Sequence, residues 1–195
     1  DESNVDPAIA AEGLRYLLRF LSAGIEVCAT FDDPDHPELG RMVEDRRSWG
    51  LDNPDCLYSY ARLDPAGRYE LSGTRGSARH LEVQVNTGHF GDGDFAGWQT
   101  VSALSGDDLT LDGDGRFTIP LSRVGTLGRD GQPSGDHLPL DERASFVLVR
   151  QYVSDWAGEE PATLHLERVD APHPARPYDA DRAAAQAALL DRWLD

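Results

Sequence analysis

Residues 50–64 have the sequence Gly-Leu-Asp-Asn-Pro-Asp-Cys-Leu-Tyr-Ser-Tyr-Ala-Arg-Leu-Asp, and this stretch combines a predicted turn with a predicted β-strand. Its first part, residues 52–55, predicts an Asx-Pro turn, because Asp and Asn side chains accept hydrogen bonds from the nearby backbone. The residues that follow include Tyr58 and Tyr60 and are typical of a β-strand, in which alternate side chains share a face. The sequence Gly-Thr-Arg-Gly at residues 73–76 predicts a second turn.

Further short strands with a two-residue period are predicted along the chain. Together with the first, they cover residues 57–63, 69–72, 81–86, 109–111, 117–121, 145–153 and 162–169. Turns are predicted between them at residues 64–67, 91–94 and 112–115. Because no crossover helix separates these strands, the pattern favours an antiparallel β-sandwich, with a closed β-barrel as the alternative.

Both ends of the chain have helical patterns. Asp6 followed by Pro7 is a typical helix start, and the apolar stripe that follows consists of Leu14, Leu17, Leu18, Leu21, Ile25 and Cys28. A shorter helix is predicted over residues 37–45, and a stiff proline linker over residues 171–177. A last helix over residues 179–194 would have one apolar side formed by Ala183, Ala187, Leu190 and Leu194. The chain thus divides into a helical segment (1–49), a β-sandwich domain (50–170) and a linker with a C-terminal helix (171–195).

Apolar stripes on the two terminal helices need a partner surface, because large apolar faces are rarely left in water. A stiff linker projects the C-terminal helix outward, so we expect the helices to mediate a homo-oligomer. The alternative is that both helices pack on the β-sandwich of the same chain.

Composition excludes several classes of function. The chain has 18 arginines and no lysine against 35 acidic residues, for a net charge of −17. This charge favours solubility and repels nucleic acids and anionic membranes. The absence of lysine excludes Schiff-base chemistry and a P-loop.

The apolar and cysteine content bears on location and redox state. No run of about 18 apolar residues is present, so we expect no membrane insertion and a cytoplasmic location, although a cleaved export signal would leave no trace. Cys28 and Cys56 are predicted to be buried thiols, with a single disulfide as the alternative.

The turn at residues 52–55 and the strand after it hold the first candidate site. Asp52 and Asp55 could act as paired acid and base carboxylates, or they could simply form the turn together with Asn53. Tyr58 and Tyr60 share a face of the strand, where they could stack a sugar or an apolar ring, or fill a core.

Other polar residues are candidates at separate places. Arg75 could hold an anion with its guanidinium, or fasten its turn to an Asp of a neighbouring loop. Arg150, Gln151 and Asp155 follow or interrupt an apolar strand and therefore need a buried network or a ligand. Residues 88–98 predict a mobile, aromatic-tipped loop over one end of the β-sandwich, and it contributes His89 and Trp98. The six histidines are widely spaced, so we expect no metal site and no cofactor.

Three stretches together resemble a known family. They are residues 50–76, residues 148–155 (Leu-Val-Arg-Gln-Tyr-Val-Ser-Asp), and residues 160–168, and the likeness extends back to residues 12–17. In order and spacing they resemble the bacterial domains of unknown function designated DUF1214, often found with the related DUF1254. The resemblance implies a jelly-roll β-sandwich and no settled activity. The chain departs from the family at residues 135–137, Gly-Asp-His, where relatives often have an Asn-Trp pair, and it ends within what is usually a longer helical extension.

Two functions are consistent with these observations. The favoured one is a binding module for a small ligand, a glycan or a partner domain, because the sequence shows no local pairing of nucleophile and base. The alternative is a hydrolase in which Asp52 or Asp55 is the acid or base and Arg75 orients an anionic group.

Overall fold

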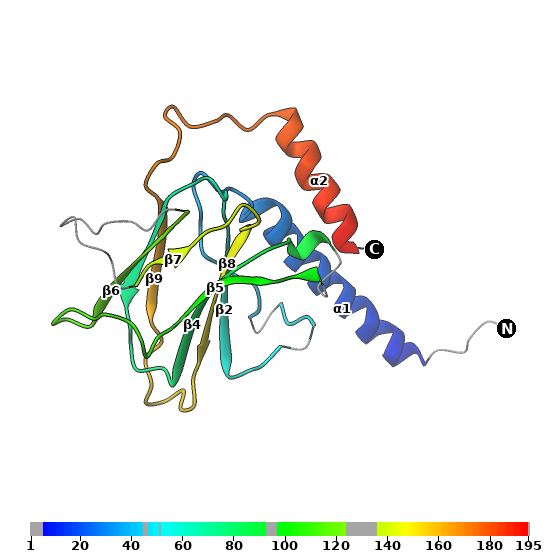
Figure 1. The fold of residues 1–195 in the computed structure, drawn as a ribbon. Coiled ribbons are helices and arrows are strands. Elements are labelled where there is room, and N and C mark those ends of the chain that lie inside the picture. Colours follow the sequence, from blue (N-terminus) through cyan, green and yellow to red (C-terminus); the bar gives the residue numbers. More distant parts are fainter. Residues whose placement is uncertain (1–5, 45–46, 51, 93–96, 124–135, 195) are drawn as a thin grey trace.

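The computed structural model describes residues 6–44, 47–50, 52–92, 97–123 and 136–194 (Figure 1). Two β-sheets pack face to face, and two terminal helices cover part of one outer face. Sheet A has the spatial order β1 (Gly40–Arg41), β2 (Cys56–Arg62), β8 (Phe146–Tyr152), β4 (His80–Asn86) and β5 (Thr100–Ser105). Sheet B has the order β7 (Leu138–Pro139), β6 (Arg116–Ser122), β3 (Tyr69–Thr74) and β9 (Thr163–Arg168). All these pairings are antiparallel except that of β6 with β7.

The space between the sheets holds the inter-sheet core, which we define by its buried residues. They are Ala61, Leu63, Tyr69, Leu71, Leu81, Val83, Val85, Phe117, Ile119, Leu121, Leu138, Leu140, Ala144, Val147, Val149, Ala162 and Leu166. The alternation of the strands produces it: Val147 and Val149 of β8 point toward sheet B, while Phe146 and Leu148 point outward. Burial of each large side chain here contributes roughly 1.5–3 kcal/mol.

A second cluster, the aromatic cap, lies between the outer face of sheet A and the helices. Its buried residues are Ala23, Val27, Cys28, Met42, Tyr60, Phe90, Phe146, Leu148 and Trp193. Helix α1 (Pro7–Ile25) begins as predicted, because the Asp6 carboxylate accepts a hydrogen bond from the Ala8 amide at 2.8 Å. It continues into a π-helix, η1 (Glu26–Thr30), which includes Cys28.

Helix α2 (Ala180–Leu194) folds back against α1, so the prediction that the proline linker projects it outward is wrong (Figure 1). Trp193 stacks on Phe20 of α1 at 4.8 Å and its Nε1 donates to the Phe20 carbonyl. The predicted apolar side of α2 is correct only in part, because Leu190 packs against the aromatic cap but Gln186 and Trp193 are the buried residues and Leu194 is 53% exposed. An ion pair explains the return of the chain: Arg176 in the linker donates to Asp35, which precedes β1.

Most of α1 is exposed to solvent. Only its last turn, at Ala23 and Gly24, is buried, whereas Leu14, Leu17 and Leu18 are each 59% exposed. The helix therefore extends away from the sheets (Figure 1). Among the helices that the structure describes, none is long and apolar enough to cross a membrane.

Six of the seven predicted strands are confirmed, with ends displaced by one or two residues. The strand predicted at 109–111 is wrong, because the Thr110 amide donates to the Asp136 carboxylate instead of a neighbouring strand. The helix predicted at 37–45 is wrong as well, since Gly40 and Arg41 pair with Tyr60 and Ser59 as β1. Turns at residues 64–67 and 112–115 are confirmed.

The turn predicted at residues 73–76 begins later than expected. Gly73 and Thr74 are the last residues of β3, paired on both sides with β6 and β9, and only Gly76 has a positive φ, of 62°. Both cysteines are buried free thiols, as predicted.

Candidate functional site

A cavity of about 200 Å³ opens on the outer face of sheet A, beside the aromatic cap. Its walls are Met42, Val43, Trp49, Gly50, Asp52, Tyr58, Asn86, Phe90, Trp98, Phe146, Leu148 and Arg150. Pockets for drug-sized molecules measure roughly 300–1,000 Å³, so this one suits a smaller group.

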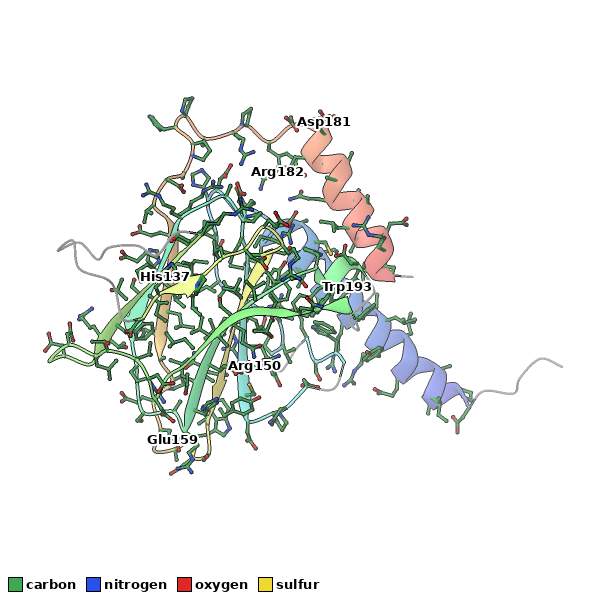
Figure 2. The ribbon with its side chains drawn as sticks, in the orientation of Figure 1. His137, Arg150, Glu159, Asp181, Arg182 and Trp193 are labelled. Atoms are coloured by element: carbon green, nitrogen blue, oxygen red, sulfur yellow. The ribbon has the colours of Figure 1, made fainter. Side chains whose placement is uncertain are left out.

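Side chains of β2, β8 and β4 form the floor of the cavity, and the register of these strands sets which of them lie together. Tyr58 of β2 lies opposite Arg150 of β8, and Asn86 of β4 lies opposite Phe146. Because the side chains alternate, Tyr58, Leu148 and Arg150 all project from the face that does not meet sheet B. Figure 2 shows Arg150 among the strands and Trp193 at the end of α2 that lies beside α1.

Aromatic rings form the walls through a chain of edge-to-face contacts. Phe90 meets Trp98 at 4.4 Å and Trp49 at 6.1 Å, and Trp98 meets Phe146 at 5.2 Å. Trp49 is also fixed by a hydrogen bond of 2.9 Å from its Nε1 to the Met42 carbonyl. Edge-to-face contact adds about 0.5–1.5 kcal/mol per pair, which holds these walls in place.

Gly88 allows Trp98 to take its position. Its φ is +82°, and a Cβ atom there would lie 2.5 Å from the Trp98 Cδ1. Both the backbone conformation and the close ring therefore require glycine at this residue.

The two charged residues in the walls differ in their partners. Arg150 donates from Nη1 to Gln84 Oε1 at 2.6 Å and lies 3.5 Å from the Glu82 carboxylate. Asp52 accepts a hydrogen bond from Ser48 Oγ at 3.0 Å, and within the described ranges no arginine or histidine pairs with it. The guanidinium is thus partly neutralised, whereas the carboxylate is not.

Burial changes the ionisation of the residues along this part of β2. It raises the pKa of the Tyr58 phenol above its usual value, and it also raises the pKa of the neighbouring Cys56 thiol. Both groups are therefore neutral at physiological pH, and Tyr58 can offer its ring or its hydroxyl to a ligand without a charge.

The structure brings together four of the residues singled out in the sequence, namely Asp52, Tyr58, Trp98 and Arg150. Asn53 and Asp55 lie outside the cavity walls. The Asn53 carboxamide accepts from the Asp55 amide, as expected of an Asx turn, and Asp55 accepts from Trp156 Nε1 at 3.3 Å on the surface.

Tyr60 and His89 are buried in or beside the aromatic cap, behind the cavity. Tyr60 is 0% exposed, and burial raises the pKa of its phenol. His89 Nδ1 accepts from the Gly91 amide at 2.7 Å, and its Nε2 lies 3.6 Å from Asp32 Oδ1. The loop predicted at residues 88–98 includes a 3₁₀ turn, η2 (Phe90–Asp92), whose Phe90 is buried and does not form an exposed tip; residues 93–96 lie outside the described residues.

Three further candidates hold loops and strands in place. Arg75 donates to the carbonyls of Ala78 and Gly106, and lies 3.9 Å from Asp107, so it fastens its turn as one alternative anticipated. Gln151 is 4% exposed and exchanges hydrogen bonds with both backbone groups of Ala162.

Asp155 is exposed and caps its own turn, with its carboxylate accepting from the Ala157 amide at 3.0 Å. It lies outside the walls of the cavity.

The aromatic walls Trp49, Phe90 and Phe146 were not predicted to be site residues. They come from three separate parts of the chain, and each has a role in the aromatic cap that sequence spacing does not reveal. The one available signal was the two-residue period of β8, which puts Phe146 on the face of Arg150.

A larger hollow, of about 430 Å³, lies between residues 32–35 and the start of α2. Its charged groups are already paired: Arg62 with Asp32 at 2.9 Å, and Arg182 with Asp33 at 3.1 Å. We regard it as a brace for the C-terminal segment. Among the described residues, no group of three or more His, Cys, Asp or Glu side chains could hold a metal ion.

Comparison with known proteins finds a solved structure with the same fold, but it indicates no activity. No family model and no curated protein matches the chain. A crystal structure of an uncharacterised protein from Burkholderia cenocepacia aligns over 98% of this chain and 50% of its own, with 30% sequence identity and a TM-score of 0.81. The chain thus shares the fold of that protein and spans half of its length. A protein from Vibrio parahaemolyticus aligns over 63% of this chain and 32% of its own, with 18% identity and a TM-score of 0.42.

Proposed function

We propose that this chain is a small-ligand-binding module whose site is the cavity on the outer face of sheet A. The observation that carries this proposal is the convergence of Asp52, Tyr58, Trp98 and Arg150, from separate segments, on one hollow with aromatic walls. Small-molecule sites are typically concave, mostly apolar, and provided with a few polar groups that fix orientation. A glycan residue or another small organic molecule would meet these conditions.

The hydrolase alternative receives less support from the geometry. It needs two carboxylates on either side of one bond, and Asp55 does not line the cavity that Asp52 lines. Asp55 is instead held at the surface by Trp156.

A fragment screen by ligand-observed NMR and thermal shift tests the binding proposal. We expect fragments to bind the wild-type chain and to stabilise it by about 2.7 kcal/mol when present at 100 times their dissociation constant. Val43→Phe, which adds a ring to the cavity wall, should abolish this binding. Val169→Phe is the matched control, because Val169 is 52% exposed and outside the cavity.

Binding that is equal in the two valine variants would place the ligand elsewhere and overturn the assignment of this cavity. Absence of any binding fragment would overturn the proposal of a small-ligand module. Far-UV circular dichroism of each variant shows that the fold is retained.

We also propose that the two sheets are a variant of the jelly-roll sandwich and that the chain is related to the DUF1214 domains. The strand order supports this, because β2, β3 and β4, and again β7, β8 and β9, alternate between the two sheets. An experimental structure of a DUF1214 domain with a different strand order would contradict it. A cytoplasmic location likewise stays a prediction.

Self-association is a separate proposal, with α1 as the contact. Its support is the exposure of Leu14, Leu17 and Leu18, which a second copy of the chain would cover. Sedimentation should show a dimer for the wild type and a monomer for the double variant Leu14→Glu, Leu17→Glu. A wild-type monomer at all concentrations would end this proposal.

A further inference from the structure

The electrostatic balance of the cavity points to one chemical class of ligand. Two charged residues line the cavity, Asp52 and Arg150. The Arg150 guanidinium lies 3.5 Å from the Glu82 carboxylate and donates to Gln84 at 2.6 Å, so the protein itself already compensates much of its charge. Asp52 has only the hydroxyl of Ser48 as a hydrogen-bond partner among the described residues. Among the described residues, the carboxylate of Asp52 is therefore the less compensated of the two charges in the cavity walls.

The aromatic walls favour the same sign of ligand. The faces of Trp, Tyr and Phe rings are negative, and a cation within about 6 Å of a ring centroid is attracted to them. Tyr58, Phe90 and Trp98 line the cavity, and burial raises the pKa of the Tyr58 phenol further above the physiological range, so it remains neutral. Rings and one carboxylate are the usual surroundings of alkylated ammonium groups in proteins.

The net charge of the whole chain also favours a cationic ligand. Its net charge of −17 raises the local concentration of cations and lowers that of anions around any cavity open to solvent. A volume of about 200 Å³ admits a compact group such as trimethylammonium and excludes a bulky one such as a nucleotide.

We infer that the cavity binds a small organic cation, with Asp52 as its counter-ion and the aromatic walls around its alkyl groups. This inference rests on the proposed binding function and names the ligand class. The competing ligand is a small organic anion held by Arg150, and the test below separates the two.

The experiment compares three probes of nearly equal shape by isothermal titration calorimetry or ligand-observed NMR. They are choline, its neutral isostere 3,3-dimethylbutan-1-ol, and the anion 3,3-dimethylbutanoate. We expect choline to bind at least about tenfold more tightly than the neutral isostere, as desolvated cation–π contacts allow, and the anion to bind most weakly.

Charge variants test the role of each residue. Asp52→Asn should weaken choline binding about tenfold while leaving the neutral probe unchanged. Asp114→Asn removes the same charge from an exposed hairpin and should change little, which controls for the net charge of the chain.

Glu82→Gln removes the carboxylate that partly neutralises Arg150, and Glu82 itself does not line the cavity. Since it leaves the Arg150 charge less compensated, it should weaken choline and strengthen the anion. Tyr58→Phe should retain choline binding, and Tyr58→Leu should lose it, because only the phenylalanine keeps the ring.

Equal affinity for choline and its neutral isostere would overturn this inference, as would preferential binding of the anion that Arg150→Gln abolishes. Failure of all three probes to bind would also overturn it. The fragment screen with Val43→Phe decides the proposed function separately, so a cavity that binds neutral fragments but not choline leaves that function standing.

Discussion

The inter-sheet core and the aromatic cap lie on opposite faces of sheet A and are built in different ways. The first is mainly aliphatic and closed, with Leu71, Ile119 and Val149 fully or almost fully buried between two sheets. The second combines rings from α1, α2 and loops with Tyr60 and Phe146 on the outer face of sheet A, and it borders a cavity. Aliphatic side chains supplied by alternating strands fill their space, whereas large rings from scattered segments leave space that a ligand can use. We therefore expect stability to come mainly from the inter-sheet core, and the proposed binding to take place on the opposite face of sheet A.

The largest expected effect comes from the inter-sheet core. Leu71 is 0% exposed in the middle of β3, so Leu71→Ala should lower the free energy of unfolding by about 4 kcal/mol through lost burial and a residual cavity. Urea denaturation followed by circular dichroism measures it. Leu111→Ala is the control, since Leu111 is 43% exposed, and it should cost less than about 1 kcal/mol. A loss below 1 kcal/mol for Leu71→Ala would contradict the assignment of stability to this core.

The next largest effect concerns Asp35, whose carboxylate connects the C-terminal linker to β9. Its carboxylate accepts from Arg176 of the linker and from Arg168 of β9, and its side chain is 6% exposed. The hydrogen bond from Arg176 holds the pKa of this carboxyl below its usual 3.8. Asp35→Asn should therefore cost on the order of 3 kcal/mol at pH 7, mostly through Arg168, because Arg176 is 62% exposed and screened by solvent.

The pH dependence of that effect has a definite sign. Because the pKa of Asp35 is lower in the folded chain than in the unfolded chain, its stabilisation is present above pH 3.8 and is lost as the pH falls through the folded value. The difference in stability between the wild type and Asp35→Asn should therefore shrink as the pH falls below 3.8. Urea titrations at pH 7 and pH 3 measure this, with Asp114→Asn as the exposed control. A difference that stays constant between these pH values would exclude ionisation as the cause.

The two regions also differed in how well the sequence predicted them. Strands of the inter-sheet core were recognised because each has a regular two-residue period, as in Phe117 to Leu121. The edge strand β5 (Thr100–Ser105) was missed, because it mixes short polar and apolar residues and none of them is buried. The helix predicted at 37–45 failed because pairing of Gly40 with Tyr60 is a tertiary contact without a local pattern.

Residues of the cavity were likewise predicted only where a local sequence pattern pointed to them. Arg150 was identified because a polar residue in an apolar strand needs a partner, and Tyr58 because two tyrosines on one face of a strand can stack a ring. Trp49 and Phe90 were not, because their position depends on contacts with Phe20, Trp193 and Trp98 from distant segments. The return of α2 could not be read from its proline linker, because the ion pair of Arg176 with Asp35 spans 141 residues.

The smallest expected effect tests whether α2 completes the aromatic cap. A Cβ atom on Gly24 would lie 2.5 Å from Trp193 Cδ1, whereas one on Gly13, in the same helix, would have nothing within 4 Å. Glycine in a helix costs roughly 1 kcal/mol relative to alanine, so Gly13→Ala and Gly24→Ala should gain the same helix propensity. Only Gly24→Ala also brings a Cβ atom against Trp193. We expect Gly13→Ala to stabilise the chain by up to about 1 kcal/mol and Gly24→Ala to destabilise it by about 1–2 kcal/mol.

Hydrogen exchange shows where that loss falls. In Gly24→Ala, amides of residues 180–194 should exchange faster because displacement of Trp193 loosens α2, while those of β3 and β8 should keep their protection. Equal stabilisation by both alanines would mean that Trp193 does not pack on Gly24 in solution. Faster exchange throughout β3 and β8 would mean that the cap and the inter-sheet core unfold as one unit, and that stability and binding are not divided between the two faces of sheet A.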